Sequence, residues 1–129
     1  MRYMKRSEKL KQIFHTWKNE YELTNGHYEY FTEESMFSKG ETAYCTLGLA
    51  GEVGECLEEF KKYVRDGGDP TKPIPNDHER YSKFIDELGD VLWYVTRLAR
   101  YHGRTLDDLM YDNMNKLIKK IESKENADR

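Results

Sequence analysis

The chain has 129 residues, of which 35% are charged and 37% are hydrophobic, and its formal net charge is -3. This length fits one domain over residues 1–129. The charges of both signs are mixed, without a basic block, so we expect no binding to nucleic-acid polymers, which needs a concentrated cationic surface. No apolar run approaches the roughly 18 residues that span a membrane, and no signal peptide is recognisable. The two cysteines have no metal or redox spacing. We therefore expect a cytoplasmic protein.

The N-terminal part of the chain predicts a helix followed by a loop. Apolar side chains recur with a helical period over residues 7–24, and Asn25-Gly26 end the pattern. This apolar stripe consists of Leu10, Ile13, Phe14, Trp17 and Tyr21. The next stretch, His27 to Phe37, has no clean period and predicts a loop with room for a short helical turn.

Three further helices are predicted, at residues 40–65, 78–102 and 105–122. The first begins at Ser38-Lys39-Gly40-Glu41, which has the spacing of a capping box, and the last begins with the same kind of signal at Thr105. Residues 66–77 contain all three prolines and predict a loop. No segment has the pattern of a strand. We therefore expect an all-α fold, a bundle of four to five helices.

The second and third predicted helices carry the same short motif of acid, apolar residue, glycine and acid. Its acidic members are Glu52, Glu55, Glu87 and Asp90. Because a helix turns by about 100° per residue, the two acids of each motif lie about 60° apart, at the border of an apolar stripe. If the two stripes pack antiparallel, the two acid pairs converge.

Four carboxylates at close range repel one another unless cations or protons neutralise them. A set of oxygen ligands suits a hard cation, so we expect Mg²⁺, or alternatively Mn²⁺. A di-iron centre would need a Glu-x-x-His motif, and no histidine here follows an acid at that spacing. Glu59 lies on the same face as Glu52 and is either a fifth acid of the site or an ion-pair partner of Lys61 or Lys62. Acid pairs on solvated helix faces are the alternative to a metal site.

Three segments carry a longer pattern in a fixed order. They are Leu47-Gly48-Leu49-Ala50-Gly51-Glu52-Val53-Gly54-Glu55, Glu87-Leu88-Gly89-Asp90-Val91-Leu92-Trp93-Tyr94 and Asn113-x-x-Lys116-Leu117. This pattern resembles the MazG-like nucleotide pyrophosphohydrolases of the all-α NTP pyrophosphatase group, which also contains the dimeric dUTPases and phosphoribosyl-ATP pyrophosphohydrolase. The resemblance runs from about Tyr44 to Leu117, and the loop at 66–77 makes the gap between the acid pairs long.

The resemblance implies hydrolysis of a nucleoside triphosphate between the α and β phosphates, with the four acids as metal ligands. By analogy with the family, the residues that contact phosphate are Lys62, Arg65, Asn113 and Lys116. We favour Glu55 as the carboxylate that accepts a proton from the attacking water. Tyr94 is one turn beyond Asp90 and is a candidate for the base pocket. Further aromatic candidates are Trp17, Tyr28, Tyr30 and Trp93.

Structural roles also fit several of these residues. Lys62 and Arg65 are compatible with a solvated helix end with favourable dipole placement, and Asn113 is compatible with a hydrogen bond between helices. A non-catalytic helical module that binds nucleotide or protein is the alternative to an enzyme, and a dUTPase-like relative is the alternative substrate class. Because the family is oligomeric and four helices are few for a closed core, we expect a homodimer or homotetramer.

Overall fold

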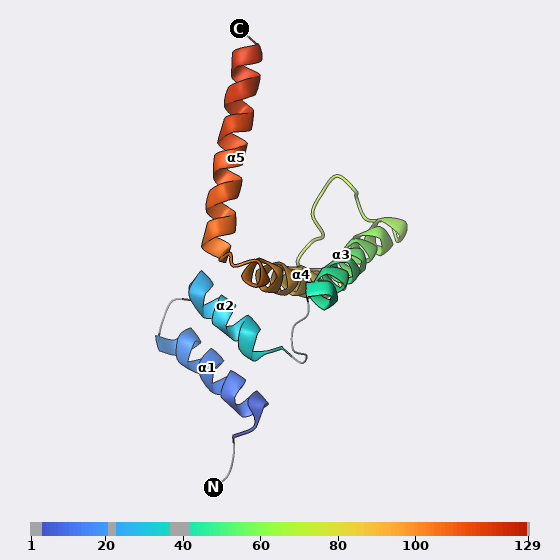
Figure 1. Ribbon diagram of the computed structural model, residues 1–129. Coiled ribbons are helices and arrows are strands. Elements are labelled where there is room, and N and C mark those ends of the chain that lie inside the picture. The colour runs from blue at the N-terminus through green and yellow to red at the C-terminus, as the bar shows by residue number, and fades with distance from the viewer. Residues whose placement is uncertain (1–3, 21–22, 37–41, 129) are drawn as a thin grey trace. The chain divides into compact units, whose positions relative to one another are not determined.

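The computed structural model describes residues 4–20, 23–36 and 42–128 of the chain, and its regular structure there is all-helical (Figure 1). The helices are α1 (Arg6–Glu20), α2 (Asn25–Glu34), α3 (Thr42–Arg65), α4 (Tyr81–Tyr101) and α5 (Leu106–Ala127). The predicted all-α fold is therefore confirmed. None of the helices described is both long and apolar enough to cross a membrane.

The chain folds as two compact units. The terminal unit combines Met1–Phe37 with Ala99–Arg129, and the central unit is Ser38–Leu98. The terminal unit therefore holds α1, α2 and α5, while the central unit holds α3 and most of α4. The single domain over residues 1–129 stays a prediction.

Helix α2 occupies the stretch that the sequence pattern assigned to a loop, and α1 ends at Glu20 rather than at residue 24. Thr24 caps α2 because its Oγ1 accepts a hydrogen bond from the backbone N–H of His27, at 3.2 Å. In return, Nδ1 of His27 accepts from the backbone N–H of Thr24, also at 3.2 Å. A histidine thus takes the place that glutamate or glutamine usually has in a capping box, so the sequence lacks the usual signal for this helix start.

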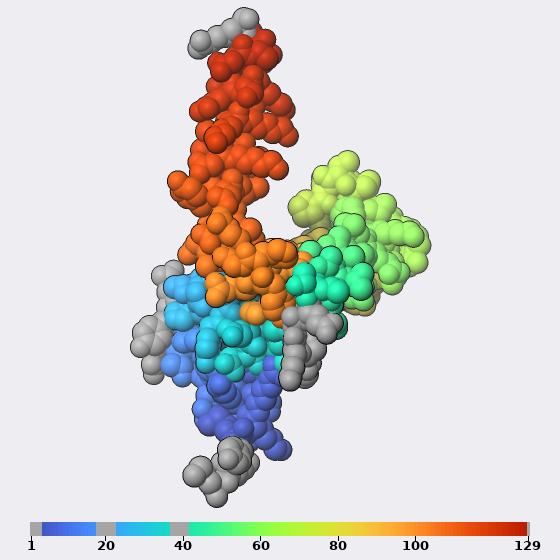
Figure 2. Space-filling model, in the orientation of Figure 1, coloured from blue at the N-terminus to red at the C-terminus, as the bar shows by residue number. Residues whose placement is uncertain are grey.

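In the terminal unit, α2 contacts the beginning of α5. The carboxylate of Glu29 accepts a hydrogen bond of 2.9 Å from the backbone N–H of Leu106, an N–H that has no partner inside its own helix. Thr105 caps α5 through a capping box with Asp108, which confirms the predicted start signal. From Met110 to Asp128 every residue is exposed, and Figure 2 shows this part of α5 uncovered by α1 and α2.

In the central unit, α3 and α4 run antiparallel. Gly48 near the start of α3 lies against Tyr94 late in α4, whereas Phe60 late in α3 packs on Phe84 early in α4, with ring centroids 6.4 Å apart. Cys56, which is 4% exposed, contributes to the core between the helices. This arrangement is the one in which the two acid motifs meet. The predicted helix start at Ser38–Glu41 lies outside the described residues.

The loop between α3 and α4 extends to residue 80, three residues further than the sequence predicted. Gly67 has a φ of 102°, which glycine adopts without strain. The ring of Tyr63 packs close to Gly68 and edge-on against His78, with ring centroids 4.9 Å apart. Ile74 is 6% exposed, so the loop has its own apolar anchor.

Candidate metal and phosphate site

Three of the four predicted acids lie together. Glu52 of α3 and Glu87 and Asp90 of α4 each bring one carboxylate oxygen within 4.8 Å of the others. Glu52 and Glu87 are half-buried and Asp90 is exposed. Glu55 is exposed and lies outside this group of three, although its charge acts on Glu52. We call Glu52, Glu87 and Asp90 the acid cluster.

Ionising the carboxyl groups of the acid cluster is unfavourable. Burial raises the pKa of Glu52 to about 7, with further contributions from a hydrogen bond with Glu87 and from the charges of Asp90, Glu55 and Glu87. Burial also raises the pKa of Asp90, and the charges of Glu87 and Asp86 add to the effect. Both shifts mean that removing the protons from these carboxyl groups is unfavourable without a compensating positive charge.

Two oxygens of the acid cluster lack hydrogen-bond donors. Oε2 of Glu52 and Oε2 of Glu87 are buried, and neither has a hydrogen-bond partner among the residues that the structure describes. A buried carboxylate oxygen without a partner is costly, so this place requires a proton or a cation. The three carboxylates are close enough for one ion to contact all of them, and two of them have unpartnered oxygens. This arrangement fits a hard divalent cation that keeps several of its waters.

Residues 41–124 match the family model described as the MazG nucleotide pyrophosphohydrolase domain. The chain belongs to this family. It is similar to the Gene 37 protein of Mycobacterium phage L5, with 40% identity over 75 residues that make up 58% of this chain and 61% of the phage protein. It is also similar to the uncharacterized protein YvdC of Bacillus subtilis strain 168, with 28% identity over 98 residues, 73% of this chain and 92% of that protein. No solved structure gives a significant match.

The MazG match confirms the resemblance that the three sequence segments carried, and it covers α3, α4 and most of α5. The aligned part of this chain spans 61% of the phage protein's length, so that protein extends beyond the shared region. The individual ligand and substrate roles of the MazG site residues stay predictions.

Glu59 is not part of the acid cluster. Its side chain is buried and accepts a hydrogen bond from Nη1 of Arg80 at 3.3 Å, while Nζ of Lys83 lies 3.2 Å from its other oxygen. Burial alone would raise the pKa of Glu59, but Lys83, Arg80 and Lys62 outweigh this effect and lower it. Of the two roles considered for Glu59, a fifth acid of the site or a member of an ion pair, the structure has the ion pair. Its partners lie on α4 and the preceding loop rather than on its own helix.

The two basic residues predicted at the end of α3 differ in their surroundings. Nζ of Lys62 lies 3.6 Å from Glu58, and the residue lines a depression of about 330 Å³. The depression is lined by Glu59, Lys62, Glu79, Arg80 and Lys83. Arg65 instead donates two hydrogen bonds to Asp66, at 2.9 and 3.2 Å, so its guanidinium is already paired. Phosphate binding by Arg65 stays a prediction and would require that this pair open.

Tyr94 lies beside the acid cluster, as its position one turn after Asp90 requires. Burial raises its pKa to about 12, helped by a hydrogen bond with Tyr44 and by the charges of Tyr44 and Glu52. Trp93 packs edge-on against its ring, with centroids 5.0 Å apart. The ring of Tyr94 therefore has a packing role, and contact with a nucleobase stays a prediction.

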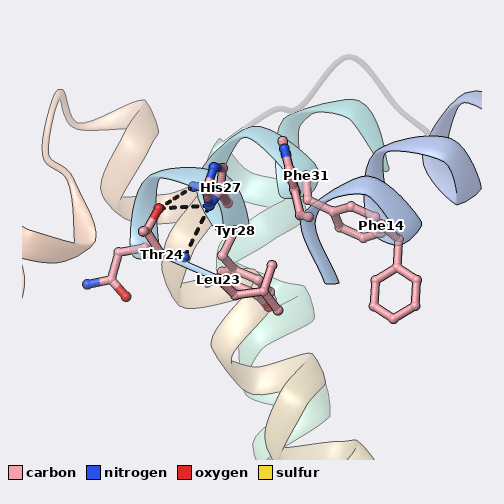
Figure 3. Close-up of a pocket in the computed structure, with 8 residues that line it drawn as sticks. Phe14, Leu23, Thr24, His27, Tyr28 and Phe31 are labelled. Carbon is pink, nitrogen blue, oxygen red and sulfur yellow. Dashed lines mark hydrogen bonds between the residues drawn. The ribbon is translucent and has the colours of Figure 1, made fainter. Parts of the chain in front are cut away.

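The remaining candidates belong to the terminal unit. Asn113 and Lys116 are exposed on α5, and their contact with phosphate stays a prediction. Trp17 and Tyr28 line an apolar pocket of about 450 Å³ between α1 and the start of α2 (Figure 3). Tyr30 packs edge-on against Trp17, with ring centroids 6.0 Å apart.

Proposed function

We propose that the protein is a metal-dependent nucleoside triphosphate pyrophosphohydrolase, which cleaves an NTP or dNTP between the α and β phosphates into a monophosphate and pyrophosphate. The observation that supports this most is the convergence of Glu52, Glu87 and Asp90 from two helices of a MazG domain. The unpartnered buried oxygens of Glu52 and Glu87 require a proton or a cation, a requirement that an acidic patch on a solvated face would not have.

Glu52, Glu87 and Asp90 would hold the cation, with Glu55 beside them. Bound Mg²⁺ or Mn²⁺ supplies charge neutralisation for phosphate oxygens and lowers the pKa of a bound water. Because Glu55 is exposed and stands outside the acid cluster, its carboxylate stays available to accept the proton of the attacking water. This separation between Glu55 and the cluster supports its assignment as general base.

The test is to incubate the purified protein with each of the common dNTPs and NTPs, including dUTP, in the presence of Mg²⁺ or Mn²⁺. Products are identified by chromatography, and pyrophosphate is measured separately from orthophosphate. We expect monophosphate and pyrophosphate in equal amounts. Orthophosphate as the primary product, or binding of nucleotide without turnover with either metal, would contradict the proposal, and the latter would indicate a non-catalytic nucleotide-binding module. Turnover of dUTP alone would identify a dUTPase-like enzyme.

We further propose that the protein assembles as a homodimer or homotetramer. Large apolar side chains are exposed on α3 and α4, among them Leu47 at 74%, Leu57 at 63% and Leu92 at 45%. On α5 the exposed apolar residues are Met110, Tyr111, Met114, Leu117, Ile118 and Ile121. Exposed apolar surface on this scale marks interaction sites. Light scattering should give twice or four times the mass of the chain, and a strict monomer would contradict the proposal.

A further inference from the structure

Along the contact between the antiparallel helices α3 and α4, which we call the seam, a second group of charged residues lies two helical turns away from the acid cluster. Glu59 follows Glu52 by seven residues, and Arg80 precedes Glu87 by seven residues. Seven residues are close to two full turns, so Glu59 keeps the angular position of Glu52 on α3, and Arg80, the residue directly before α4, lies about two turns before Glu87. The ion pair between Glu59 and Arg80 shows that the two shifted positions meet, as Glu52 and Glu87 do.

Moving by seven residues from Glu55 on α3 and from Asp90 on α4 leads to two lysines. Lys62 follows Glu55 by seven residues, and Lys83 precedes Asp90 by seven residues. All four shifted positions line the same depression of about 330 Å³ beside α3 and α4. The four acids are therefore followed along the seam by a matching group of one acid, one arginine and two lysines, and a second acid, Glu79, completes the lining of the depression. About 10 Å of helix axis separates the two.

The two lysines keep donors available for a ligand. The side chain of Lys83 is 63% exposed, and only one of its three N–H donors is needed for Glu59. The side chain of Lys62 is 34% exposed, and its partner Glu58 is exposed as well, so this ion pair is weak and exchangeable. Arg80, in contrast, is tied to both Glu59 and Asp66.

We propose that Lys83 joins Lys62, which the family resemblance already implies as a phosphate contact, in binding the β- and γ-phosphates of the substrate, the part that leaves as pyrophosphate. Glu59 and Arg80 are then positioning residues for Lys83. A triphosphate held by its α-phosphate at the acid cluster would extend along the seam, and the flexible stem of Lys62 covers part of the remaining distance. Glu59 fixes the head of Lys83 at the edge of the depression, and Arg80 keeps Glu59 in place. This inference rests on the proposed function, from which it takes the triphosphate substrate.

The experiment compares Lys83→Gln and Lys62→Gln with Lys61→Gln, a matched control at an exposed neighbouring position of α3. Calorimetry measures binding of inorganic pyrophosphate and of a nucleoside monophosphate in the presence of Mg²⁺, and separately binding of Mn²⁺ alone. We expect Lys83→Gln and Lys62→Gln to weaken pyrophosphate binding about tenfold each, the loss of one charge-assisted contact. Monophosphate and Mn²⁺ binding should be unchanged, and Lys61→Gln should match the wild type throughout.

The positioning role is tested with Glu59→Gln, which should weaken pyrophosphate binding and raise KM while leaving Mn²⁺ binding unchanged. Lys83→Arg should restore most of the affinity that Lys83→Gln loses. If Glu59→Gln does not fold, the exposed Lys83 variants decide the question alone. Equal pyrophosphate affinity in Lys83→Gln and wild type, or parallel weakening of monophosphate and pyrophosphate, overturns the inference. A wild type that binds pyrophosphate through Lys83 but hydrolyses no triphosphate contradicts the proposed function while supporting the phosphate site.

Discussion

Tyr94 of α4 packs directly on the backbone of Gly48 in α3, where a Cβ atom would stand 2.3 Å from Cε1 of the tyrosine ring. Gly48 lies four residues before Glu52, and Tyr94 lies four residues after Asp90. The contact therefore sets the approach of the two helices one turn from the acid cluster. It also gives a physical reason for the first glycine of the segment that resembles the MazG family.

Replacing Gly48 with alanine should destabilise the protein. The added methyl group has no room unless the Tyr94 ring moves, and such overpacking costs about 1–3 kcal/mol. Gly51→Ala is the matched control, because nothing lies within 4 Å of a Cβ at that position. In the control, the higher helix propensity of alanine should leave stability unchanged or increase it by up to about 1 kcal/mol. Urea unfolding of the two variants would contradict this account if Gly48→Ala were as stable as Gly51→Ala.

Substituting Glu52 or Glu55 should separate metal binding from proton transfer. Glu52→Gln removes a member of the acid cluster and should abolish both Mn²⁺ binding and turnover. Glu55→Gln leaves the cluster intact, so it should retain most Mn²⁺ binding while turnover falls by about 10²- to 10⁴-fold, as expected for loss of a general base. Calorimetry with Mn²⁺ and the pyrophosphate assay measure the two effects. Equal loss of Mn²⁺ binding in both variants would make Glu55 a ligand rather than a separate base.

The helices that carry the site were predictable because their apolar stripes are regular. The start of α5 at Thr105 and the facing of the two acid motifs follow from short-range signals that act within one or two turns. Helix α2 was missed because His27 completes its capping box and its aromatic residues follow no clear period. The predicted start of this helix at residue 78 is three residues before the observed start of α4 at Tyr81.

The partners of Glu59 were missed for a different reason. Helical periodicity predicts which residues share a face. The axial register between two packed helices depends instead on how their side chains interdigitate. Once Glu52 and Glu87 are placed opposite each other, the positions of Glu59 and Arg80 follow from counting two turns in each direction. The signal was therefore present in the sequence, although it becomes visible only when the register between α3 and α4 is known.

Metal binding should increase the stability of the protein. Neutralising the carboxylates of Glu52, Glu87 and Asp90 removes their repulsion, and a ligand at about 100 times its Kd contributes about 2.7 kcal/mol. Thermal unfolding with increasing Mg²⁺ at mildly alkaline pH should show a rising Tm that chelation by EDTA reverses. Asp90→Asn should reduce this rise, whereas Asp69→Asn in the loop should not. A wild-type Tm that does not change with the Mg²⁺ concentration would argue against a cation at the acid cluster.

Without metal, the stability of the protein should fall as the pH rises across the range in which Glu52 ionises. The pKa of Glu52 is about 7 in the folded protein, against an ordinary value of 4.5. Between these two values the folded state holds a proton that the unfolded state has released, so unfolding becomes easier with increasing pH. Mg²⁺ competes for the same carboxylate and should bind more weakly as the pH falls below about 7.

Urea unfolding in metal-free buffer, from about pH 5 to about pH 8, measures this dependence. Glu52→Gln carries no charge at this position, so its stability should change less over the range and should exceed that of the wild type at the alkaline end. Asp86→Asn is a useful comparison, because this residue is exposed and acts on Asp90 but is outside the acid cluster. If wild type and Glu52→Gln showed the same pH dependence, Glu52 would not be the group that titrates, and the assignment of the raised pKa to this buried carboxyl group would be wrong.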